Sequence, residues 1–199
     1  MTLSELLIAT TNQKKGREMM QILSAALPGI KLVTLADFSN WVEVEETGET
    51  FEENARLKAL AALKQTGLAS LADDGGLVVD ALGGAPGVHS HRFLGAETSF
   101  DVKMDYILKE LHGLDVKQRT CRFQCAVALA YRDGSLFECL GSCEGVIASE
   151  KRGQGGFGYD PVFWLPDLQC CMAELSPEEK HRISHRGKAL ACIIEKLRD

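Results

Sequence analysis

Two long strand patterns joined by a tight turn constrain the fold of this chain most. Residues 119–131 and 135–147 both read as strands, and Arg132-Asp133-Gly134 lies between them. An Asp-Gly pair between two such runs is a strong hairpin signal. The sequence therefore predicts a sheet that contains a hairpin of two long strands.

Shorter strand and helix patterns precede and follow this hairpin. We expect strands at residues 6–9, 30–35 and 162–165, and helices from near Lys15 to Leu27, from Thr50 to about Gln65, at 101–111 and at 185–197. Thr50 and Glu53 form a capping box at the start of the second helix. Residues 82–88 and 152–161 are rich in glycine and read as loops. The second loop contains G-x-G-x-x-G, but no helix follows it, so we do not interpret it as a dinucleotide site. The fold class is expected to be α/β.

Composition limits the possible partners. The chain has 199 residues, of which 45% are hydrophobic and 25% charged, as in ordinary globular proteins. This length suits one domain or one bilobed unit spanning 1–199. The net charge of -6 disfavours non-specific binding to nucleic acid, which needs a broad basic face. No apolar run approaches the ~20 residues of a membrane span, and the acidic N-terminus does not resemble a signal peptide. We therefore expect a cytoplasmic protein with neither nucleic acid nor membrane as partner.

The seven cysteines are scattered through apolar segments. Cys121 and Cys125 share one face of a predicted strand, and Cys139 and Cys143 share a face of the next. A structural zinc site is the alternative to buried thiols, but the spacings are loose for zinc. We expect buried, reduced thiols in a cytosolic protein.

Two adjacent carboxylates, Asp73 and Asp74, follow the apolar run 68–72 and precede Gly75 and Gly76. We interpret this stretch as strand, acidic turn, strand. Paired carboxylates at the end of a strand suit a hard cation such as Mg²⁺. A solvated turn that closes a hairpin explains the same residues, and this stretch alone does not decide between them.

Cationic and polar groups lie on three predicted helices, two of them at the helix start. The turn from Thr10 to Lys15 leads from a strand into a helix, which predicts an anion site, although simple helix capping explains it too. Lys58 shares a helix face with Asn54, and it either points to a phosphate or lies on a solvated face. His185 and Arg186 oppose the dipole of the last helix, which suggests that they are placed for a ligand.

Six motifs in this order carry a resemblance over essentially the whole chain. They are Thr10-Thr11-Asn12-Gln13-Lys14-Lys15, Glu45-Glu46-Thr47-Gly48-Glu49-Thr50-Phe51, Ala72-Asp73-Asp74-Gly75-Gly76-Leu77, Gly83-Gly84-Ala85-Pro86-Gly87, Gly156-Phe157-Gly158-Tyr159-Asp160-Pro161 and Ser184-His185-Arg186-Gly187. The set closely resembles the bacterial form of the inosine triphosphate pyrophosphatase family. Two positions depart from the family pattern: Thr11 stands where glycine is usual, and Gly75 replaces a serine, which removes a hydroxyl contact.

The resemblance implies an elongated α/β fold with a long mixed sheet flanked by helices, two lobes with a central substrate cleft, and a homodimer. It also implies Mg²⁺-dependent hydrolysis of ITP, dITP and XTP to the monophosphate and pyrophosphate, which cleanses the nucleotide pool.

Site roles carry over from the family residue by residue. Asp74 is implied as general base and, with Glu45, as metal ligand. The phosphate-binding residues are implied to be Thr10, Thr11, Asn12, Gln13, Lys14, Lys15, Lys58, Gly75 and Arg92. The base and sugar end is implied to lie against Phe157, Gly158, Tyr159, Asp160, Lys180, His185 and Arg186. Donors from Arg186 or His185 at the 6-oxo edge of the base would favour hypoxanthine and xanthine over adenine.

Three other functions use the same residues. A metal-dependent phosphatase with Asp73 or Asp74 as nucleophile would release orthophosphate. A nucleotide sensor would bind without turnover, and the Gly75 departure keeps this alternative open. A structural α/β protein would carry the motifs only as satisfied polar turns.

Overall fold

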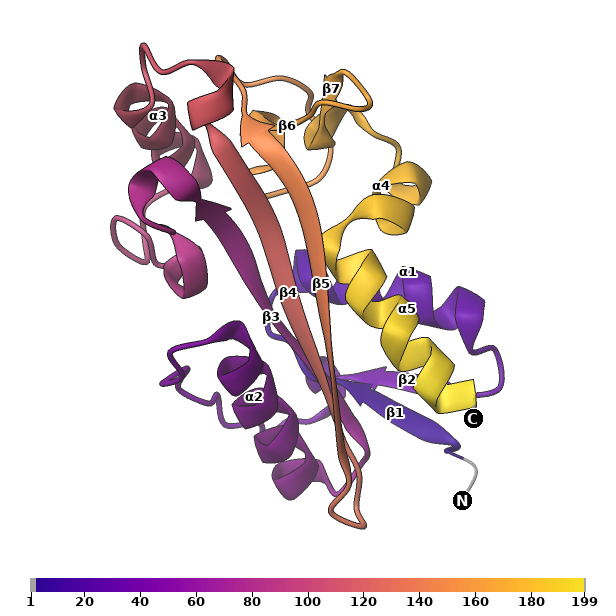
Figure 1. The fold of residues 1–199 in the computed structure, drawn as a ribbon. Coiled ribbons are helices and arrows are strands. Elements are labelled where there is room, and N and C mark those ends of the chain that lie inside the picture. Colours follow the sequence, from indigo (N-terminus) through magenta and orange to yellow (C-terminus); the bar gives the residue numbers. More distant parts are fainter. Residues whose placement is uncertain (1–2, 199) are drawn as a thin grey trace. The chain divides into compact units, whose positions relative to one another are not determined.

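The structure of the protein is a computed structural model, and it describes residues 3–198. Seven strands form one sheet in the order β2-β1-β3-β4-β5-β6-β7 within these residues (Figure 1). The strands are β1 Glu5–Ile8, β2 Lys31–Thr34, β3 Ser70–Val79, β4 Thr120–Ala130, β5 Leu136–Ile147, β6 Phe163–Leu165 and β7 Cys170–Cys171. The helices are α1 Gln13–Ala26, α2 Phe51–Thr66, α3 Phe100–Glu110, α4 Pro177–Ile183 and α5 His185–Arg198.

The sheet is mixed. Strand β1 runs parallel to β2 and to β3, whereas β6 runs antiparallel to β5 and to β7. The predicted α/β class and mixed sheet are confirmed, and so is the hairpin, which joins β4 to β5 through a backbone bond from Tyr131 N–H to Ser135 O. The predicted elongated shape, single bilobed domain and cleft stay predictions. No helix between residues 3 and 198 is long and apolar enough to cross a membrane.

The chain divides into two compact units. The first comprises the described residues up to Asp74, Cys125–Gly141 and those from His185 onward. The second comprises Gly75–Gln124 and Ser142–Ser184. Strands β3, β4 and β5 contribute residues to both units, and the boundary in β3 falls directly after Asp74.

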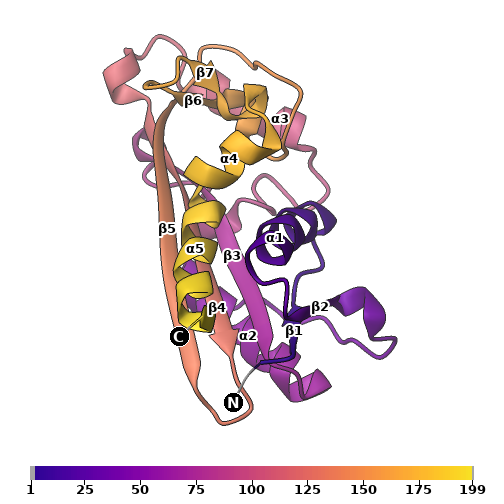
Figure 2. The same ribbon diagram turned by 90° about the vertical axis from the view of Figure 1, so that its right-hand side faces the viewer.

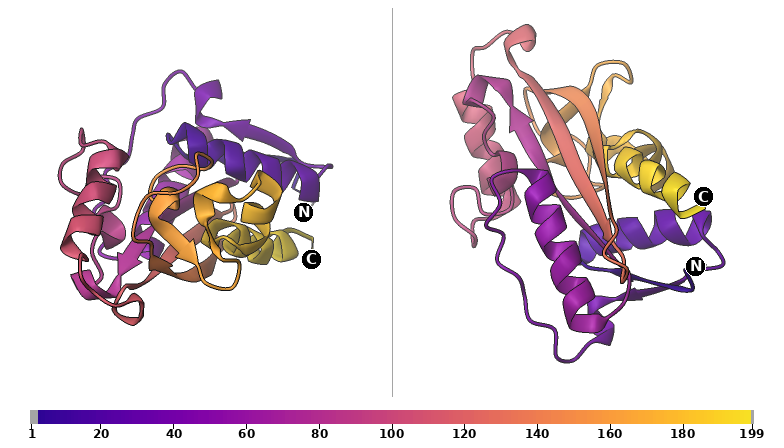
Figure 3. Two further views of the ribbon diagram at one scale, coloured as in Figure 1. Left: turned by 90° about the horizontal axis from the view of Figure 1, so that it is seen from above. Right: turned by 60° about the horizontal axis from the view of Figure 1, so that its bottom comes forward.

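The first unit is built around β1 and its neighbours. Its buried cluster joins the start of the sheet to two helices through Leu6, Leu71, Met19, Leu190 and Ile193. Helices α1 and α5 pack against each other on one face of these strands (Figure 2), and α2 lies on the other face (Figure 3). Helices α1 and α5 therefore present side chains to one face of the first residues of β3, and α2 presents side chains to the other.

The second unit has its own buried cluster. Leu77 of β3, Ile107 of α3, Phe123 of β4 and Phe163 of β6 belong to it, and the rings of Phe123 and Phe163 stack at 4.3 Å between centroids. The Ser99 hydroxyl accepts from Val102 N–H and so caps α3. In the same way Ser176 caps α4, whose first residue is Pro177, a position that suits proline.

One predicted element is wrong. Residues 70–79 form a single continuous strand, so the Asp-Asp-Gly-Gly stretch is not a turn. Asp73 and Asp74 are buried and paired with cations. Gly76 permits a close approach of another segment, since a Cβ there would lie 2.2 Å from Ser90 Oγ. Gly76 therefore serves packing inside a strand, which is a known use of glycine there.

The expectation that all cysteines are reduced is also wrong. Cys139 of β5 and Cys192 of α5 form a disulfide. The remaining five cysteines are free. Sequence separation hid this pair, because its members lie 53 residues apart.

Candidate active site

Asp73 and Asp74 point to opposite faces of β3, because neighbouring side chains alternate along a strand. Both carboxylates are buried, with exposed fractions of 1% and 6%. Charged groups on both faces of the strand are costly to bury unless they are paired. Each aspartate accordingly has its own cationic partners in the first unit.

Asp73 faces helices α1 and α5. Its Oδ2 accepts bonds from Arg186 Nε at 3.1 Å and Nη2 at 3.0 Å, and Lys15 Nζ lies 3.3 Å away. A third group, Glu18 on α1, accepts from Arg186 Nη1 at 2.7 Å. Burial alone would raise the pKa of Asp73, but Lys15 and Arg186 hold that pKa below its usual range. Asp73 is therefore an ionised carboxylate that orients two cations.

Asp74 faces helix α2. Its Oδ1 accepts from Lys58 Nζ at 2.9 Å, and the same ammonium donates to Glu46 Oε1 at 2.7 Å. Burial raises the pKa of Asp74 and outweighs the opposing effect of Lys58. A carboxylate with a raised pKa is a stronger base than an ordinary aspartate. The two adjacent aspartates thus have opposite electrostatic character.

The loop before α2 is anchored to these groups by Asn54. This side chain is 0% exposed, and its Oδ1 accepts from Gly48 N–H at 2.8 Å. Its Nδ2 lies 3.4 Å from both Gly48 O and Asp74 Oδ2. A Cβ at Gly48 would lie 2.7 Å from Asn54 Oδ1, so glycine is needed for this approach. The carboxylate of Glu46 is thereby held on the same side of β3 as Asp74.

The turn from Thr10 to Lys15 is a capped helix start. Asn12 Oδ1 accepts from the backbone N–H groups of Lys14 at 3.0 Å and Lys15 at 3.2 Å. Thr10 Oγ1 accepts from Asn12 N–H, and Thr11 Oγ1 donates to Glu43 Oε1, both at 3.2 Å. The capping alternative is confirmed. An anion at this turn would meet the lysine side chains rather than these backbone groups.

In the second unit, Asp160 organises the Phe157–Asp160 loop. Its Oδ2 accepts from Phe157 N–H at 2.7 Å and from Lys180 Nζ at 2.7 Å. The ammonium of Lys180 also lies 4.6 Å from the centre of the Phe157 ring. Gly158 adopts a φ of 68°, a left-handed value that favours glycine. The structure therefore brings together four of the residues predicted for the base end, namely Phe157, Gly158, Asp160 and Lys180.

Tyr159 has a different environment. It is 2% exposed, and its hydroxyl donates to Ser90 O at 2.9 Å. Its ring meets Phe100 edge to face at 5.1 Å between centroids. The Tyr159 ring is thus part of the core, so Phe157 is the aromatic residue of this loop that remains partly exposed.

Two interpretations of single residues need correction. Lys58 does not lie on a solvated helix face, because its side chain is 18% exposed and bonded to two carboxylates. The positive charge of Arg186 has protein partners, Asp73 and Glu18, so its position at the start of α5 is not evidence for a ligand. Sequence reasoning missed Glu18 and the anchoring role of Asn54. Only the three-residue spacing from Lys15 to Glu18, which places both on one helix face, was available as a signal.

Residues 3–198 contain no group of three or more His, Cys, Asp or Glu side chains arranged to hold a metal ion. Two carboxylate oxygens nevertheless converge on one positive charge, since Asp74 and Glu46 share the Lys58 ammonium. Oxygen ligands of this kind suit Mg²⁺. Glu45, the predicted ligand, is exposed. The donor set therefore fits a hard cation through Asp74 and the Glu45–Glu46 loop.

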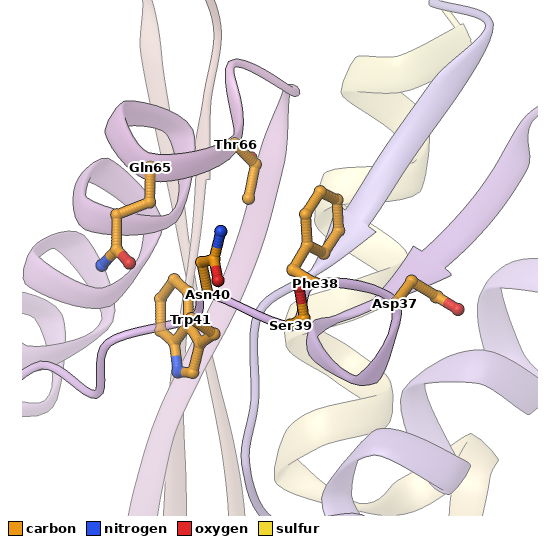
Figure 4. Close-up of a pocket in the computed structure, with 7 residues that line it drawn as sticks. All are labelled: Asp37, Phe38, Ser39, Asn40, Trp41, Gln65 and Thr66. Atoms are coloured by element: carbon orange, nitrogen blue, oxygen red, sulfur yellow. The ribbon is translucent and has the colours of Figure 1, made fainter.

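A pocket of about 260 Å³ lies elsewhere in the first unit (Figure 4). It is formed by residues 37–41 and by the end of α2, and none of the predicted site residues lines it. Beside it, the Gln65 amide exchanges two bonds of 3.0 Å with the backbone of Val42. This contact ties the start of the loop that carries Glu45 and Glu46 to α2.

Comparison with known proteins agrees with the motifs. A profile of the Ham1 family matches residues 6–196. The dITP/XTP pyrophosphatase of Geobacillus kaustophilus is 48% identical over 193 residues, which cover 97% of this chain and 94% of that protein. The Ham1 protein of Staphylococcus aureus has a similar structure, with a TM-score of 0.88, 36% identity and 98% of both chains covered. A structure named as nucleoside-triphosphatase or dITP/XTP pyrophosphatase, from Mycobacterium abscessus, has a TM-score of 0.75 and 40% identity, and the match covers 95% of this chain and 98% of that one.

These matches span almost the whole chain and include every motif that carried the resemblance. The family predicted from those motifs is therefore confirmed. This chain belongs to the Ham1 family.

Proposed function

We propose that this protein is a Mg²⁺-dependent pyrophosphatase of non-standard purine nucleoside triphosphates. Its substrates are ITP, dITP and XTP, and its products are the nucleoside monophosphate and pyrophosphate. The activity is that of the dITP/XTP pyrophosphatases to which the chain is similar. The observation that carries the proposal is the arrangement around β3, where Asp73 binds Arg186 and Lys15 on one face and Asp74 shares the Lys58 ammonium with Glu46 on the other.

In this mechanism Asp74 is the general base. It accepts a proton from the water that attacks the α-phosphorus, and the bond from that phosphorus to the bridging oxygen breaks as pyrophosphate leaves. Phosphoryl transfer depends mostly on positioning and on neutralising charge. Lys15 is held in place by Asp73, and with Lys14, Lys58 and Arg92 it neutralises the triphosphate. Thr10, Thr11, Asn12, Gln13 and the backbone of Gly75 line the same phosphates.

The metal site consists of Asp74 and the loop that carries Glu45 and Glu46. Two of these carboxylates already share one cation, the Lys58 ammonium. When bound there, Mg²⁺ neutralises phosphate oxygens and stabilises the leaving group. The Lys58 ammonium, which donates to both Glu46 and Asp74, is a donor that could also bind a phosphate oxygen.

The base end of the nucleotide is assigned to Phe157, Gly158, Tyr159, Asp160, Lys180, His185 and Arg186. The bonds from Asp160 to Lys180 and to Phe157 N–H support a fixed loop in which the Phe157 ring meets the base. For Arg186, its bonds to Asp73 and Glu18 support an indirect role through the orientation of Asp73. Arg186→Ala tests the two roles, because loss of ITP preference over ATP identifies base reading and an equal loss on both identifies orientation.

A product assay tests the reaction. The purified chain is incubated with ITP, dITP, XTP, GTP and ATP, each with and without Mg²⁺, and pyrophosphate is separated from orthophosphate. Mg²⁺-dependent pyrophosphate from the first three substrates alone supports the proposal. Orthophosphate as product would instead identify a phosphatase, and ITP binding without turnover would identify a sensor.

Asp74→Asn isolates the base. The variant keeps the shape of the side chain and removes its charge, and we expect activity to fall at least ~100-fold, as for removal of a general base. Near-normal turnover would exclude Asp74 from this role.

We also propose that the protein is a cytoplasmic homodimer. A mass in solution equal to one chain would contradict the dimer.

A further inference from the structure

Lys103 of α3 is a buried lysine without a carboxylate partner in the described chain. It is 1% exposed, and no carboxylate of residues 3–198 lies within ion-pair distance of its ammonium. Burial lowers the pKa of Lys103, and no nearby anion opposes this effect. An unpaired charge in a protein interior is unfavourable for stability, so the position needs another explanation.

The ammonium of Lys103 binds the turn that precedes Arg92. Its Nζ donates to His91 O at 2.5 Å and lies 4.8 Å from the centre of the Phe100 ring. The preceding carbonyl, Ser90 O, accepts from the Tyr159 hydroxyl at 2.9 Å. Two consecutive carbonyls of this turn are thus held from two different elements of the second unit.

The same turn is also fixed from within by the buried Ser90. Its Oγ accepts from Leu77 N–H at 2.9 Å and donates to Gly87 O at 2.6 Å. Arg92 follows directly, with an exposed side chain whose Nε donates to His89 Nδ1 at 3.1 Å. Whatever fixes the carbonyls of Ser90 and His91 therefore also fixes the backbone from which Arg92 extends.

We propose that Lys103 is a positioning residue that holds the Ser90–His91 turn so that Arg92 is presented to the triphosphate. The inference rests on the proposed function, which assigns Arg92 to the phosphates. An ammonium suits this task because a charged donor bonds a carbonyl about twice as strongly as a neutral one. A residue with a purely structural role here would resemble its buried neighbours on α3, Met104 and Ile107, which are apolar.

A double-mutant cycle between Lys103 and Arg92 tests the proposal. Lys103→Met keeps the length of the stem and removes the charged donor. Lys109→Met is the matched control, since Lys109 is an exposed lysine on the same helix. Kinetic constants for ITP and Tm are measured for wild type, K103M, K109M, R92A and R92A with K103M. Misplacing a substrate-orienting group by about 1 Å is worth up to ~100-fold in rate.

We expect kcat/KM of K103M to fall ~10-fold or more, with a Tm no lower than that of the wild type, because the variant removes an unpaired charge whose burial is unfavourable. K109M should match the wild type. In the R92A background K103M should cause little further loss, since Lys103 acts through Arg92.

Three results would overturn the inference: K103M kinetics equal to those of K109M, a fall in Tm with unchanged kcat/KM, or losses that multiply in the double variant. If K103M does not fold, Lys103→Gln takes its place in the same cycle, because its amide is a neutral donor. The proposed function fails separately, namely if R92A alone leaves kcat/KM for ITP unchanged.

Discussion

Replacing each aspartate of β3 by asparagine should affect stability differently, because the two carboxylates have different partners. Asp73→Asn removes the charge that faces Lys15 and Arg186, and its side chain is 0% exposed. Removing one partner of a buried ion pair typically costs about 3–5 kcal/mol. Glu18 still bonds Arg186, so we take the lower end, about 3 kcal/mol. For a chain of this size that corresponds to a fall in Tm of about 6–12 °C.

Asp74→Asn should leave Tm unchanged or raise it. The pKa of Asp74 is raised, so the ionised form at neutral pH is less favourable in the folded chain than in the unfolded chain. Asparagine removes that unfavourable charge, and Lys58 keeps its bond to Glu46. The same variant should lose activity at least ~100-fold if Asp74 is the base.

Thermal unfolding at pH 7.5 without Mg²⁺ measures the effect on stability, and pyrophosphate release from ITP with Mg²⁺ measures the effect on activity. The pH dependence gives a further check on Asp73. Its folded pKa is lowered, so its stabilising effect is present above the unfolded value of about 3.9 and is lost as pH falls below that value. The gap in Tm between wild type and D73N should therefore close in acid. Equal losses of Tm in D73N and D74N would refute the distinction between the two carboxylates.

Three further predictions concern the packing and the cations around the site. Gly76→Ala should lower stability by about 1–3 kcal/mol in denaturant unfolding, because its Cβ would lie 2.2 Å from Ser90 Oγ, whereas Gly29→Ala, with nothing within 4 Å, should have no such effect. Lys58→Met leaves Asp74 and Glu46 facing each other without their cation, so Mg²⁺ should raise the Tm of this variant more than that of the wild type; an equal rise would argue against a metal at these carboxylates. Alkylation of the denatured, unreduced chain should label the five free cysteines, and reduction should expose the remaining two, Cys139 and Cys192; seven labels without reduction would contradict the disulfide.

Local signals in the sequence predicted local structure well. The capping box at Thr50 and Glu53 is present, and the Asp-Gly turn joins β4 to β5. The order of the motifs was sufficient to identify the family. Such signals act within a few residues, so one sequence contains all that is needed to recognise them.

The partners of the site residues were not predictable in this way. Arg186 and Asp73 are separated by 113 positions, and Lys58 and Asp74 by 16. A single sequence shows that such groups exist but not which of them meet after folding. For the same reason the lack of a carboxylate beside Lys103 was invisible, since its helix reads as an ordinary amphipathic segment.

The strand that replaces the predicted turn is also the reason why Asp73 and Asp74 differ. In a solvated Asp-Asp-Gly-Gly turn both carboxylates would meet water, and neither pKa would move far from its ordinary value. A continuous strand instead sends adjacent side chains to opposite faces. One aspartate then meets Arg186 and Lys15, and the other meets a single lysine that it shares with Glu46. The chemical difference between two identical neighbours therefore follows from strand geometry, and an insertion of one residue between them would place both on the same face and remove it.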